Sequence, residues 1–392
     1  MFNRSNTCFI LFISIILVQQ FIACSKYQTA GPEYAYPKAV FIEQRGNGFR
    51  TWDLSYVTTT GNAKATEMFF VDSAHGWIFD GERLMSTSDA GKSWESRSMP
   101  RHDEIRLLEL IFENREIGWM LVSSEKRGGD QSFRVTLYRT SDGGKKWNES
   151  LKWEPAYGGN MRLLGRNLWI DAMKSNRAAL HADEPLILVV DTETVSARDV
   201  SAPLNALDIN PANKDERRPS WSEFAIQPSG CVLAKDDIGL FARSCDTGET
   251  WNAVRRTGKR TPPYNDSGWD VFSSYGFFSG ATLINGKGVT SLFIPEDELL
   301  SKVGTIIFPK YIPRFGFATD DGRIILAAEH NPLRDFPERT TDIMISDPSA
   351  LNWHLIASLG DFAFEVVKPA EGEGVLWLLM RGGRIAKLES PE

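Results

Sequence analysis

The stretch that decides the fold is residues 140–147, which read TSDGGKKW. The same pattern, Ser/Thr-x-Asp-x-Gly-x-x-Trp, recurs at residues 87–94 (TSDAGKSW) and 244–251 (SCDTGETW). A degraded copy at residues 345–353 keeps Ser, Asp and Trp but is one residue longer and lacks the Gly. Four fixed positions in eight, found three times, indicate an internal structural repeat.

The chemistry of the motif is local. The Asp carboxylate can accept hydrogen bonds from backbone N–H groups of its own turn, and Gly permits the positive φ that a tight turn needs. The Trp then covers the turn with apolar area. We therefore expect a structural and not a catalytic role for Asp89, Gly91, Trp94, Asp142, Gly144, Trp147, Asp246, Gly248 and Trp251.

The spacing of the copies predicts the architecture. They begin at residues 87, 140 and 244, a step of 53 followed by a step about twice as long, which leaves room for a missing copy near residue 192. Another fits near residue 295. A unit of about 50 residues with several short strands is typical of a β-propeller blade. We count about seven blades, with six or eight as alternatives: 64–106, 107–157, 158–206, 218–260, 270–310, 312–360 and 361–390.

The last of these units lacks a Trp-bearing strand, and residues 48–57 (GFRTWDLSYV) supply a candidate. An N-terminal strand in that place would close the ring and remove open sheet edges. The expected fold is therefore an all-β, about seven-bladed β-propeller that forms one domain over residues 39–392.

Two paired stretches carry a resemblance to known families. FVDSAHGW followed by STSDAGKSWE, and IGWM followed by RTSDGGKKWN, resemble the repeat of the photosystem II assembly-factor propellers. They are also similar to the wider Asp-box (BNR) class, which includes sialidases. The resemblance implies a propeller fold, while repeat motifs of this kind say little about function.

The N-terminus resembles a bacterial lipoprotein signal. The apolar run Cys8–Val18 has the length of a signal-peptide core and is short for a membrane span. It ends at Phe-Ile-Ala-Cys, similar to a lipobox, which implies a signal peptide at residues 1–23 and lipidation of Cys24. Ser25 after the Cys implies the outer membrane, with the protein on the periplasmic face. Residues 24–38 would be a tether. An ordinary cleaved signal peptide is the alternative.

Two cysteines remain beyond the signal region, in GCVLAKDDIGLFARSC. Two short apolar runs flank a polar turn, so a hairpin would bring Cys231 opposite or nearly opposite Cys245. In an oxidising periplasm we expect a disulfide with a structural role, and two free buried thiols are the alternative.

Other chemistry is sparse. The net charge of −7 and the absence of a long basic stripe make nucleic acid an unfavourable partner. None of the five histidines pairs with another at metal-ligand spacing, so we expect no metal and no cofactor. Arg50, in FRTW, partly matches the Phe-Arg-Ile-Pro motif of sialidases, although a surface arginine is the favoured interpretation.

Irregular loops are the expected place for binding, because rigid scaffolds carry function there. Two long polar loops are candidates, residues 205–220 and residues 255–269, of which the second forms a basic patch beside aromatic residues; loop 331–337 is similar but weaker. Arginine, tyrosine and tryptophan are common binding anchors. Our candidate partner-binding residues are Arg255, Arg256, Lys259, Arg260, Tyr264 and Trp269.

We therefore expect a non-catalytic envelope lipoprotein, monomeric when free, that binds a protein partner. The favoured version is an immunity protein that occludes a periplasm-acting effector such as a type VI secretion phospholipase, with the lipid anchor holding it at the membrane. An assembly factor for a membrane complex is one alternative. A sialidase-like glycoside hydrolase or carbohydrate-binding protein is the other.

Overall fold

The structure is a computed structural model of the 392-residue chain. It describes residues 38–42, 53–59, 67–100, 105–125, 133–154, 156–174, 184–207, 221–226, 230–236, 241–256, 269–272, 277–284, 287–296, 299–309, 311–319, 323–330, 340–347, 352–369 and 374–391. In 38–42, 255–256 and 269–309, and at scattered positions in other strands, the description covers the backbone only. All these residues belong to one compact unit, residues 37–258 with 265–392.

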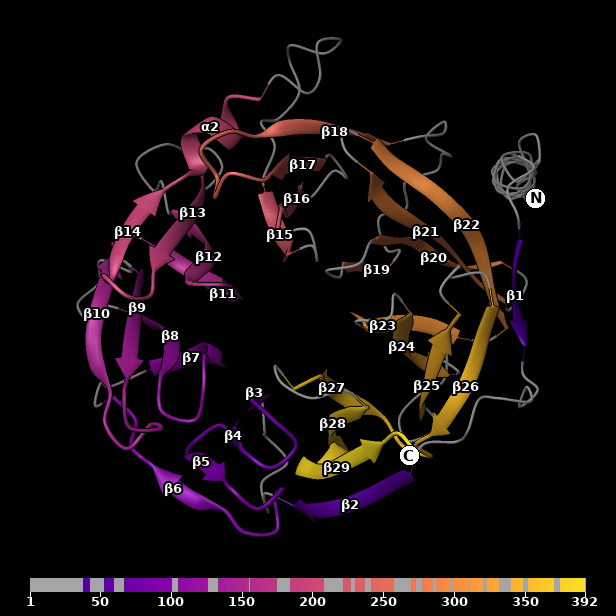
Figure 1. The fold of residues 1–392 in the computed structure, drawn as a ribbon, viewed down its shortest axis with the longest axis horizontal. Helices are drawn as coiled ribbons and strands as arrows, with labels where there is room; N and C mark the ends of the chain where they lie inside the picture. Colours follow the sequence, from indigo (N-terminus) through magenta and orange to yellow (C-terminus); the bar gives the residue numbers. More distant parts are fainter. Residues whose placement is uncertain are drawn as a thin grey trace, which may run out of the picture. The chain divides into compact units, whose positions relative to one another are not determined.

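The described unit is built from antiparallel runs of four strands placed around a centre (Figure 1). Blade one holds β3 (Glu67–Phe70), β4 (Gly76–Phe79), β5 (Leu84–Thr87) and β6 (Glu95–Arg97). Blade two holds β7 (Ile105–Phe112), β8 (Gly118–Glu125), β9 (Phe133–Thr140) and β10 (Asn148–Trp153). Blade three holds β11 (Ala156–Leu164), β12 (Asn167–Lys174), β13 (Glu184–Asp191) and β14 (Ser196–Asp199), followed by the short helix α2 (Ser201–Asn205).

The second half repeats the scheme. Blade four holds β15 (Trp221–Ile226), β16 (Val232–Asp236), β17 (Phe241–Ser244) and β18 (Asn252–Arg256). Blade five holds β19 (Trp269–Phe272), β20 (Phe277–Ile284), β21 (Lys287–Glu296) and β22 (Leu299–Pro309). Blade six holds β23 (Tyr311–Ala318), β24 (Ile324–His330), β25 (Thr340–Ser346) and β26 (Asn352–Ser358). Blade seven holds β27 (Ala363–Val367), β28 (Val375–Met380), the 3₁₀ turn Arg381–Gly383 and β29 (Arg384–Glu389).

The all-β propeller prediction is confirmed, but the blades are not seven separate sheets. Blades one, two, three and seven are separate four-stranded sheets. Blades four, five and six merge into one thirteen-stranded sheet, because β18 pairs in parallel with β22, and β1 (Lys38–Ile42) pairs in parallel with β22 and β26. The expected strand pattern persists, and the parallel pairs add contacts that the repeat does not encode.

The predicted N-terminal closing strand is confirmed. Strand β2 (Asp53–Thr59) pairs antiparallel with β29 and completes blade seven, so that indigo and yellow strands lie together in Figure 1. Its bounds lie later than the expected 48–57, and residues 48–52 are outside the described ranges. The strand joins the two ends of the propeller sequence within one sheet.

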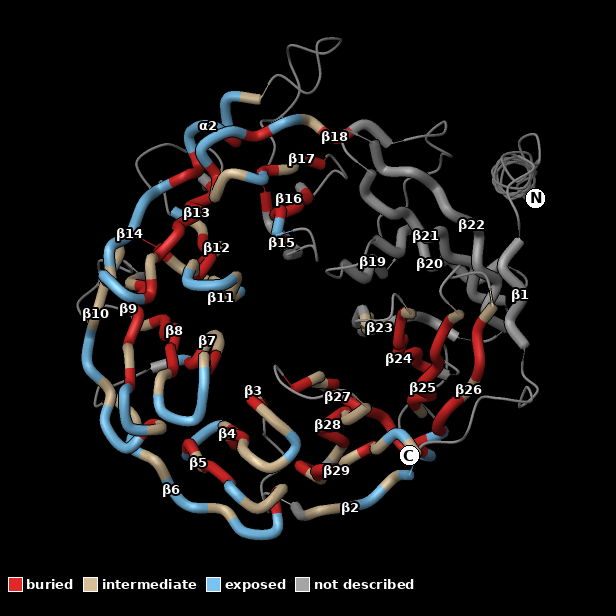
Figure 2. The backbone as a smooth tube through the Cα atoms, viewed as in Figure 1, coloured by how far each residue is buried: buried red, intermediate tan, exposed pale blue. Residues whose placement is uncertain are grey.

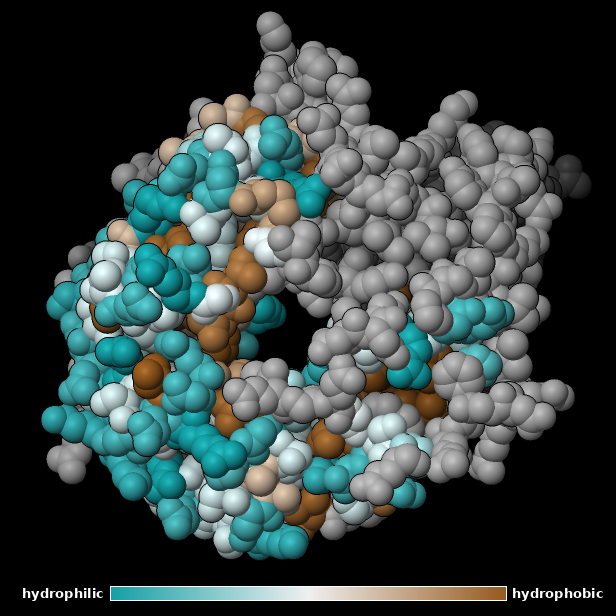
Figure 3. All heavy atoms as spheres, in the orientation of Figure 1, coloured by the Kyte–Doolittle hydropathy of each residue, from teal (hydrophilic) through white to brown (hydrophobic). Residues whose placement is uncertain are grey.

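The core lies between neighbouring blades. One buried cluster combines residues of β8, β9, β12 and β13, and another combines residues of β24–β26 with residues of β27–β29. Figure 2 shows the middle strands buried and the outer strands β6, β10 and β14 largely exposed. Hydrophobic side chains likewise gather towards the inner side of the described blades in Figure 3. Each sheet therefore buries its faces against its neighbours.

Aromatic stacks repeat across two of these seams. The Trp377 ring of blade seven stacks on Phe70 of blade one with centroids 3.9 Å apart, and Trp77 of blade one stacks on Phe112 of blade two at 3.5 Å. Each Phe ring lies over a glycine: a Cβ on Gly76 would lie 2.3 Å from the Phe70 ring, and one on Gly118 would lie 2.4 Å from the Phe112 ring. This packing explains the Gly-Trp pairs upstream of the Asp boxes.

Candidate functional site

The Asp boxes are closed hydrogen-bonded turns. In the second box the Thr140 hydroxyl donates to Asp142 Oδ1 (2.8 Å) and accepts from the Gly144 N–H (2.9 Å). Asp142 Oδ1 also accepts from the Lys146 N–H at 2.9 Å. The first and third boxes repeat these bonds, and their glycines Gly91 and Gly248 share with Gly144 a φ of +77° to +85°.

Each box also contacts the preceding blade. The Trp77 indole of blade one donates from Nε1 to the Gly143 carbonyl of the second box at 3.1 Å. Gly91 of the first box lies against Val57 of the closing strand, and Gly248 of the third box lies against Val200 of blade three. The motif therefore braces the seam between blades as well as its own turn.

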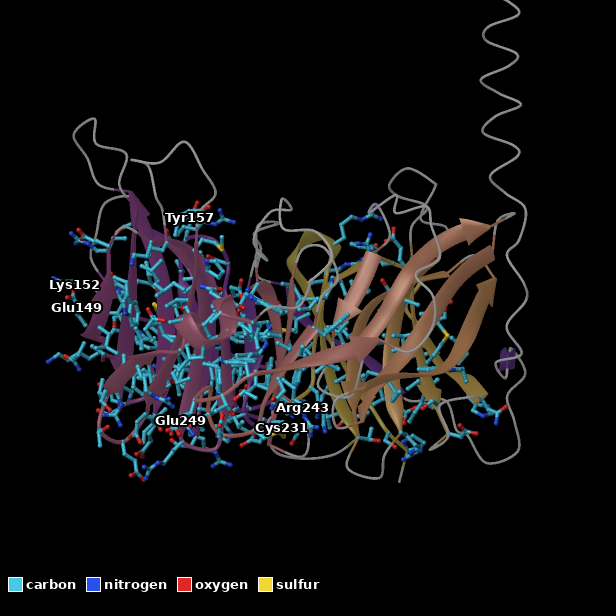
Figure 4. The ribbon with its side chains drawn as sticks, turned by 90° about the horizontal axis from the view of Figure 1, so that it is seen from above. Glu149, Lys152, Tyr157, Cys231, Arg243 and Glu249 are labelled. Atoms are coloured by element: carbon cyan, nitrogen blue, oxygen red, sulfur yellow. A yellow bond between two sulfur atoms is a disulfide. The ribbon has the colours of Figure 1, made fainter. Side chains whose placement is uncertain are left out.

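The predicted disulfide is confirmed. Cys231 and Cys245 are bonded with Cα atoms 4.2 Å apart, linking the residue before β16 to the third Asp box. The Arg243 guanidinium donates from Nη2 to Cys231 Sγ at 3.2 Å (Figure 4). Cys231 is 5% exposed, whereas Cys245 is exposed.

A pocket of about 380 Å³ opens between the Asp boxes of blades one and two. Its walls come from four turns: the β3–β4 turn with His75, the first box, the β7–β8 turn with Arg115, and the second box with Asp142. Arg97 of β6 and Trp77 of β4 complete it. Because it needs turns from two blades, the pocket exists only where blades one and two pack together. We call it the seam pocket.

One carboxylate ties the two blades together beside the seam pocket. Asp72 accepts the backbone N–H groups of Ala74 and His75 (both 2.8 Å), lies 3.0 Å from His75 Nδ1, and accepts from Arg115 of blade two (3.0 Å to Nη2). Burial alone would raise the pKa of Asp72, but these donors outweigh it and lower the pKa to about 2. Asp72 is therefore a fixed anion across the physiological range.

A second cation lies deeper. The Arg97 side chain is 17% exposed and pairs with Glu95 at 3.0 Å, while its Nε is buried without an acceptor among the described residues. Lys145 and Glu116 add one charge of each sign to the walls. Burial would raise the pKa of Asp142, but hydrogen bonds from Lys146 and Thr140 lower it below its ordinary value. This balanced, donor-rich lining suits a polar peptide segment better than proton transfer by Asp142, which is held ionised.

The innermost strands carry acids with the opposite behaviour. Burial, followed by the charge of Glu109, raises the pKa of Glu67 on β3 to about 8. Burial raises the pKa of Glu109 on β7 to about 6, although Arg162 of β11 lies 3.5 Å away. Burial also raises the pKa of Glu365 on β27 well above its ordinary value, and the charges of Glu67 and Glu109 raise it further. We call these three the inner acids.

The loop residues selected from sequence lie mostly beyond the described ranges. Arg255 and Arg256 end β18 and Trp269 begins β19, with backbone described and side chains not. The remaining selected positions, all outside the described residues, are Cys24, Arg50, Lys259, Arg260 and Tyr264, together with Asn213–Arg218 and loop 331–337.

Sequence reasoning missed Arg97 and Arg115. Arg115 lies just ahead of the IGWM stretch, which on sequence carried only a family resemblance. Alignment of the FVDSAHGW and IGWM stretches on their Gly-Trp pairs places Arg115 opposite Ser73. A long cationic side chain in place of a small residue in a repeated turn was the available hint. Within the described ranges no three His, Cys, Asp or Glu side chains cluster as metal ligands, and no helix there could cross a membrane.

The matched part of the chain contains the whole seam pocket. Residues 47–184 match the family model of Photosynthesis system II assembly factor YCF48. That span includes the closing strand, blades one and two, and every pocket residue from His75 to Lys145. No curated protein matches the chain.

Solved propellers with the same fold extend over most of the chain. YCF48 from Cyanidioschyzon merolae is 15% identical with a TM-score of 0.54, and the match covers 86% of this chain and 98% of that one. A structure of YCF48 bound to D1 peptide is 13% identical with a TM-score of 0.51, covering 88% and 98%. At this identity the likeness concerns the fold.

Proposed function

We propose that this chain is a non-catalytic assembly factor that binds a polar segment of a partner protein in the seam pocket. One observation carries the proposal: the span similar to a known assembly-factor family, residues 47–184, contains the pocket entire. A structural neighbour, YCF48, has been solved with a D1 peptide, and we extend peptide binding as a mode to this chain.

The chemistry of the pocket supports binding over catalysis. Two of its cations are held in ion pairs, Arg97 with Glu95 and Arg115 with Asp72, and hydrogen bonds lower the pKa of Asp142 in its wall and of Asp72 beside it. Such groups offer fixed hydrogen-bond donors and acceptors to a ligand. A general acid would instead need a carboxyl group that remains protonated near neutral pH.

This choice departs from the function favoured on sequence. An immunity protein against a secreted phospholipase was expected from the envelope address and the lack of catalytic residues. Neither argument concerns the binding surface, and the family match supports the assembly-factor alternative. We retain as proposals that Cys24 is lipidated and that the propeller faces the periplasm from the outer membrane. A palmitate label lost in Cys24→Ala, with the label absent from the inner-membrane fraction, is the expected result.

Binding is tested by filling the pocket. Ser88 lines the pocket and is exposed, so Ser88→Trp should block the pocket without disturbing the core. Lys92 lies in the same Asp box and is exposed but does not line the pocket, so Lys92→Trp is the matched control. Each tagged full-length variant is crosslinked in the native envelope, and the captured proteins are identified and then titrated against the purified chain.

The expected result is a specific partner that Lys92→Trp retains and that Ser88→Trp binds at least about tenfold more weakly, a loss of about 1.4 kcal/mol. Equal binding by both variants would remove the seam pocket as the site. Recovery of no partner would overturn the assembly-factor proposal. Turnover of a fluorogenic sialoside that depends on Arg50 would favour the glycoside hydrolase alternative instead.

A further inference from the structure

The disulfide of blade four has two unlike sulfur atoms. Cys245, the second residue of the third Asp box, is exposed, and Cys231 is only 5% exposed. Only Cys231 Sγ accepts a hydrogen bond from the Arg243 guanidinium, at 3.2 Å. Figure 4 places Cys231 and Arg243 at the same edge of the described blades. One sulfur, that of Cys245, is therefore on the accessible side of the bond, and the other, that of Cys231, lies beside a positive charge.

That division matches the requirements of thiol–disulfide exchange. A thiolate attacks whichever sulfur it can reach, and the reaction is faster when the departing sulfur is stabilised as a thiolate. Exposure selects Cys245 for attack, and the Arg243 cation stabilises negative charge on the departing Cys231. We propose that the Cys231–Cys245 disulfide is a site of reversible thiol–disulfide exchange with a dithiol reductant, attacked at Cys245.

The reaction balances over two steps. A thiolate of the dithiol bonds to Cys245 Sγ, and the S–S bond breaks with its electron pair passing to Cys231 Sγ. The second thiolate of the dithiol then attacks its partner sulfur in the mixed disulfide, which releases Cys245 as a thiolate and closes the dithiol into a disulfide. The two protein sulfurs take up the two protons lost by the dithiol, which is oxidised by two electrons.

The exchange needs no unfolding of the box. The Ser244 hydroxyl bonds Asp246 and the Gly248 N–H at 2.9 and 2.8 Å, and Asp246 accepts the Thr250 N–H at 3.0 Å. None of these bonds involves sulfur. Arg198 of blade three also donates to the Thr247 carbonyl at 2.8 Å, so blade three is bonded to the third box independently of the disulfide. The site can therefore cycle while the propeller stays folded.

The test follows reduction of the purified, oxidised full-length protein by dithiothreitol, with the thiols counted by maleimide labelling and mass spectrometry. Arg243→Gln should slow the second-order rate by about fivefold, because the departing thiolate loses its cation. Arg198→Gln is the control, since Arg198 contacts the same box through Thr247 and should leave the rate unchanged. Brief treatment with oxidised glutathione after reduction should place glutathione on Cys245.

Three results would overturn the proposal. One is a reduction rate that saturates at the global unfolding rate, measured in parallel by circular dichroism. Another is an unchanged rate in Arg243→Gln with its fold intact, and the third is glutathione on Cys231. If Arg243→Gln does not fold, Arg243→Lys, which keeps the charge, should reduce at close to the wild-type rate, and a loss of reactivity there counts against the mechanism.

Discussion

Carboxylates in the turns and carboxylates on the innermost strands have pKa values shifted in opposite directions. In the β3–β4 turn, Asp72 accepts four donors and its pKa falls to about 2. On the innermost strands, burial raises the pKa of Glu67 to about 8. Both groups lie in blade one, within a few residues of each other in sequence. The number of donors that the backbone and its neighbours provide decides whether the pKa rises or falls, and burial by itself does not.

The difference divides the molecule by role. The turn carboxylates are permanently charged and hold turns and seams together. The pKa values of the inner acids are raised, to about 8 for Glu67 and about 6 for Glu109, and the folded state favours their neutral form. The outer turns should therefore weaken in acid, and the inner strands should weaken as the pH rises.

The largest expected effect comes from Glu67. Its folded pKa is raised to about 8 from an ordinary value of 4.5, so its contribution is complete below pH 4.5 and is lost as the pH rises towards 8. A tenfold difference in proton affinity between the folded and unfolded chain corresponds to about 1.4 kcal/mol. Glu67→Gln should flatten the fall in unfolding free energy over this window, measured by urea titrations at several pH values. If the unfolding free energy of the variant falls with pH as steeply as that of the wild type, Glu67 does not stabilise the fold through its neutral form.

Breaking one Asp box should cost less. Thr140 is fully buried and its hydroxyl both bonds Asp142 and accepts the Gly144 N–H. Thr140→Val keeps the shape and removes both bonds, for an expected loss of about 2 kcal/mol in denaturant titrations. Thr136→Val on the same strand is the control, because Thr136 is also buried and its hydroxyl makes no side-chain hydrogen bond among the described residues. Equal losses in the two variants would mean that the box bonds contribute nothing net.

The expected loss of stability at low pH depends on Asp72. Its lowered pKa gives stability that is complete above about pH 3.8 and is lost as the pH falls through about 2. Asp72→Asn should lower the unfolding free energy at pH 6 by about 1.5 kcal/mol and make the acid branch shallower, because the variant has no carboxylate to protonate. Acid titrations followed by tryptophan fluorescence measure both effects. An unchanged acid midpoint and slope would contradict the assignment.

The smallest effect is expected at Arg115. Its side chain is 64% exposed although it bonds Asp72 across the seam, so Arg115→Ala should change the unfolding free energy by no more than about 0.5 kcal/mol. Added salt should reduce that small difference further. A loss as large as that of Asp72→Asn would mean that the cross-blade ion pair, and not the backbone donors, sets the properties of this turn.

Much of the architecture could be predicted from sequence because the repeat encodes it locally. The box of residues 140–147 contains the donors, the acceptor and the positive-φ glycine that it needs, and each expected blade overlaps an observed run of strands. The cysteine pair followed from its hairpin. The joining of blades five and six through β1 could not be predicted, because parallel pairing with distant strands leaves no periodic pattern in residues 38–42.

The seam pocket was also beyond sequence reasoning. It forms where Arg115 meets Asp72, 43 positions earlier, and no local pattern near either residue indicates the other. The inner acids Glu67 and Glu109 read as ordinary strand residues, since their burial depends on neighbouring blades. Local hydrogen bonds can be inferred from a motif, whereas a shared environment between blades requires the closed structure.

The closing strand is synthesised early but can pair only late, because its partner β29 lies at the other end of the propeller sequence. The hydrogen bond from Ser55 to Lys387 spans 332 positions, so the closing strand β2 finds its partner only when almost the whole chain has been synthesised. Until then β2 presents an unpaired edge, and the Val57 side chain that should lie under the first Asp box has no sheet to hold it. Nascent chains are therefore exposed to aggregation throughout translation. A premature stop that removes β29 leaves both β2 and β28 without the strand that joins them.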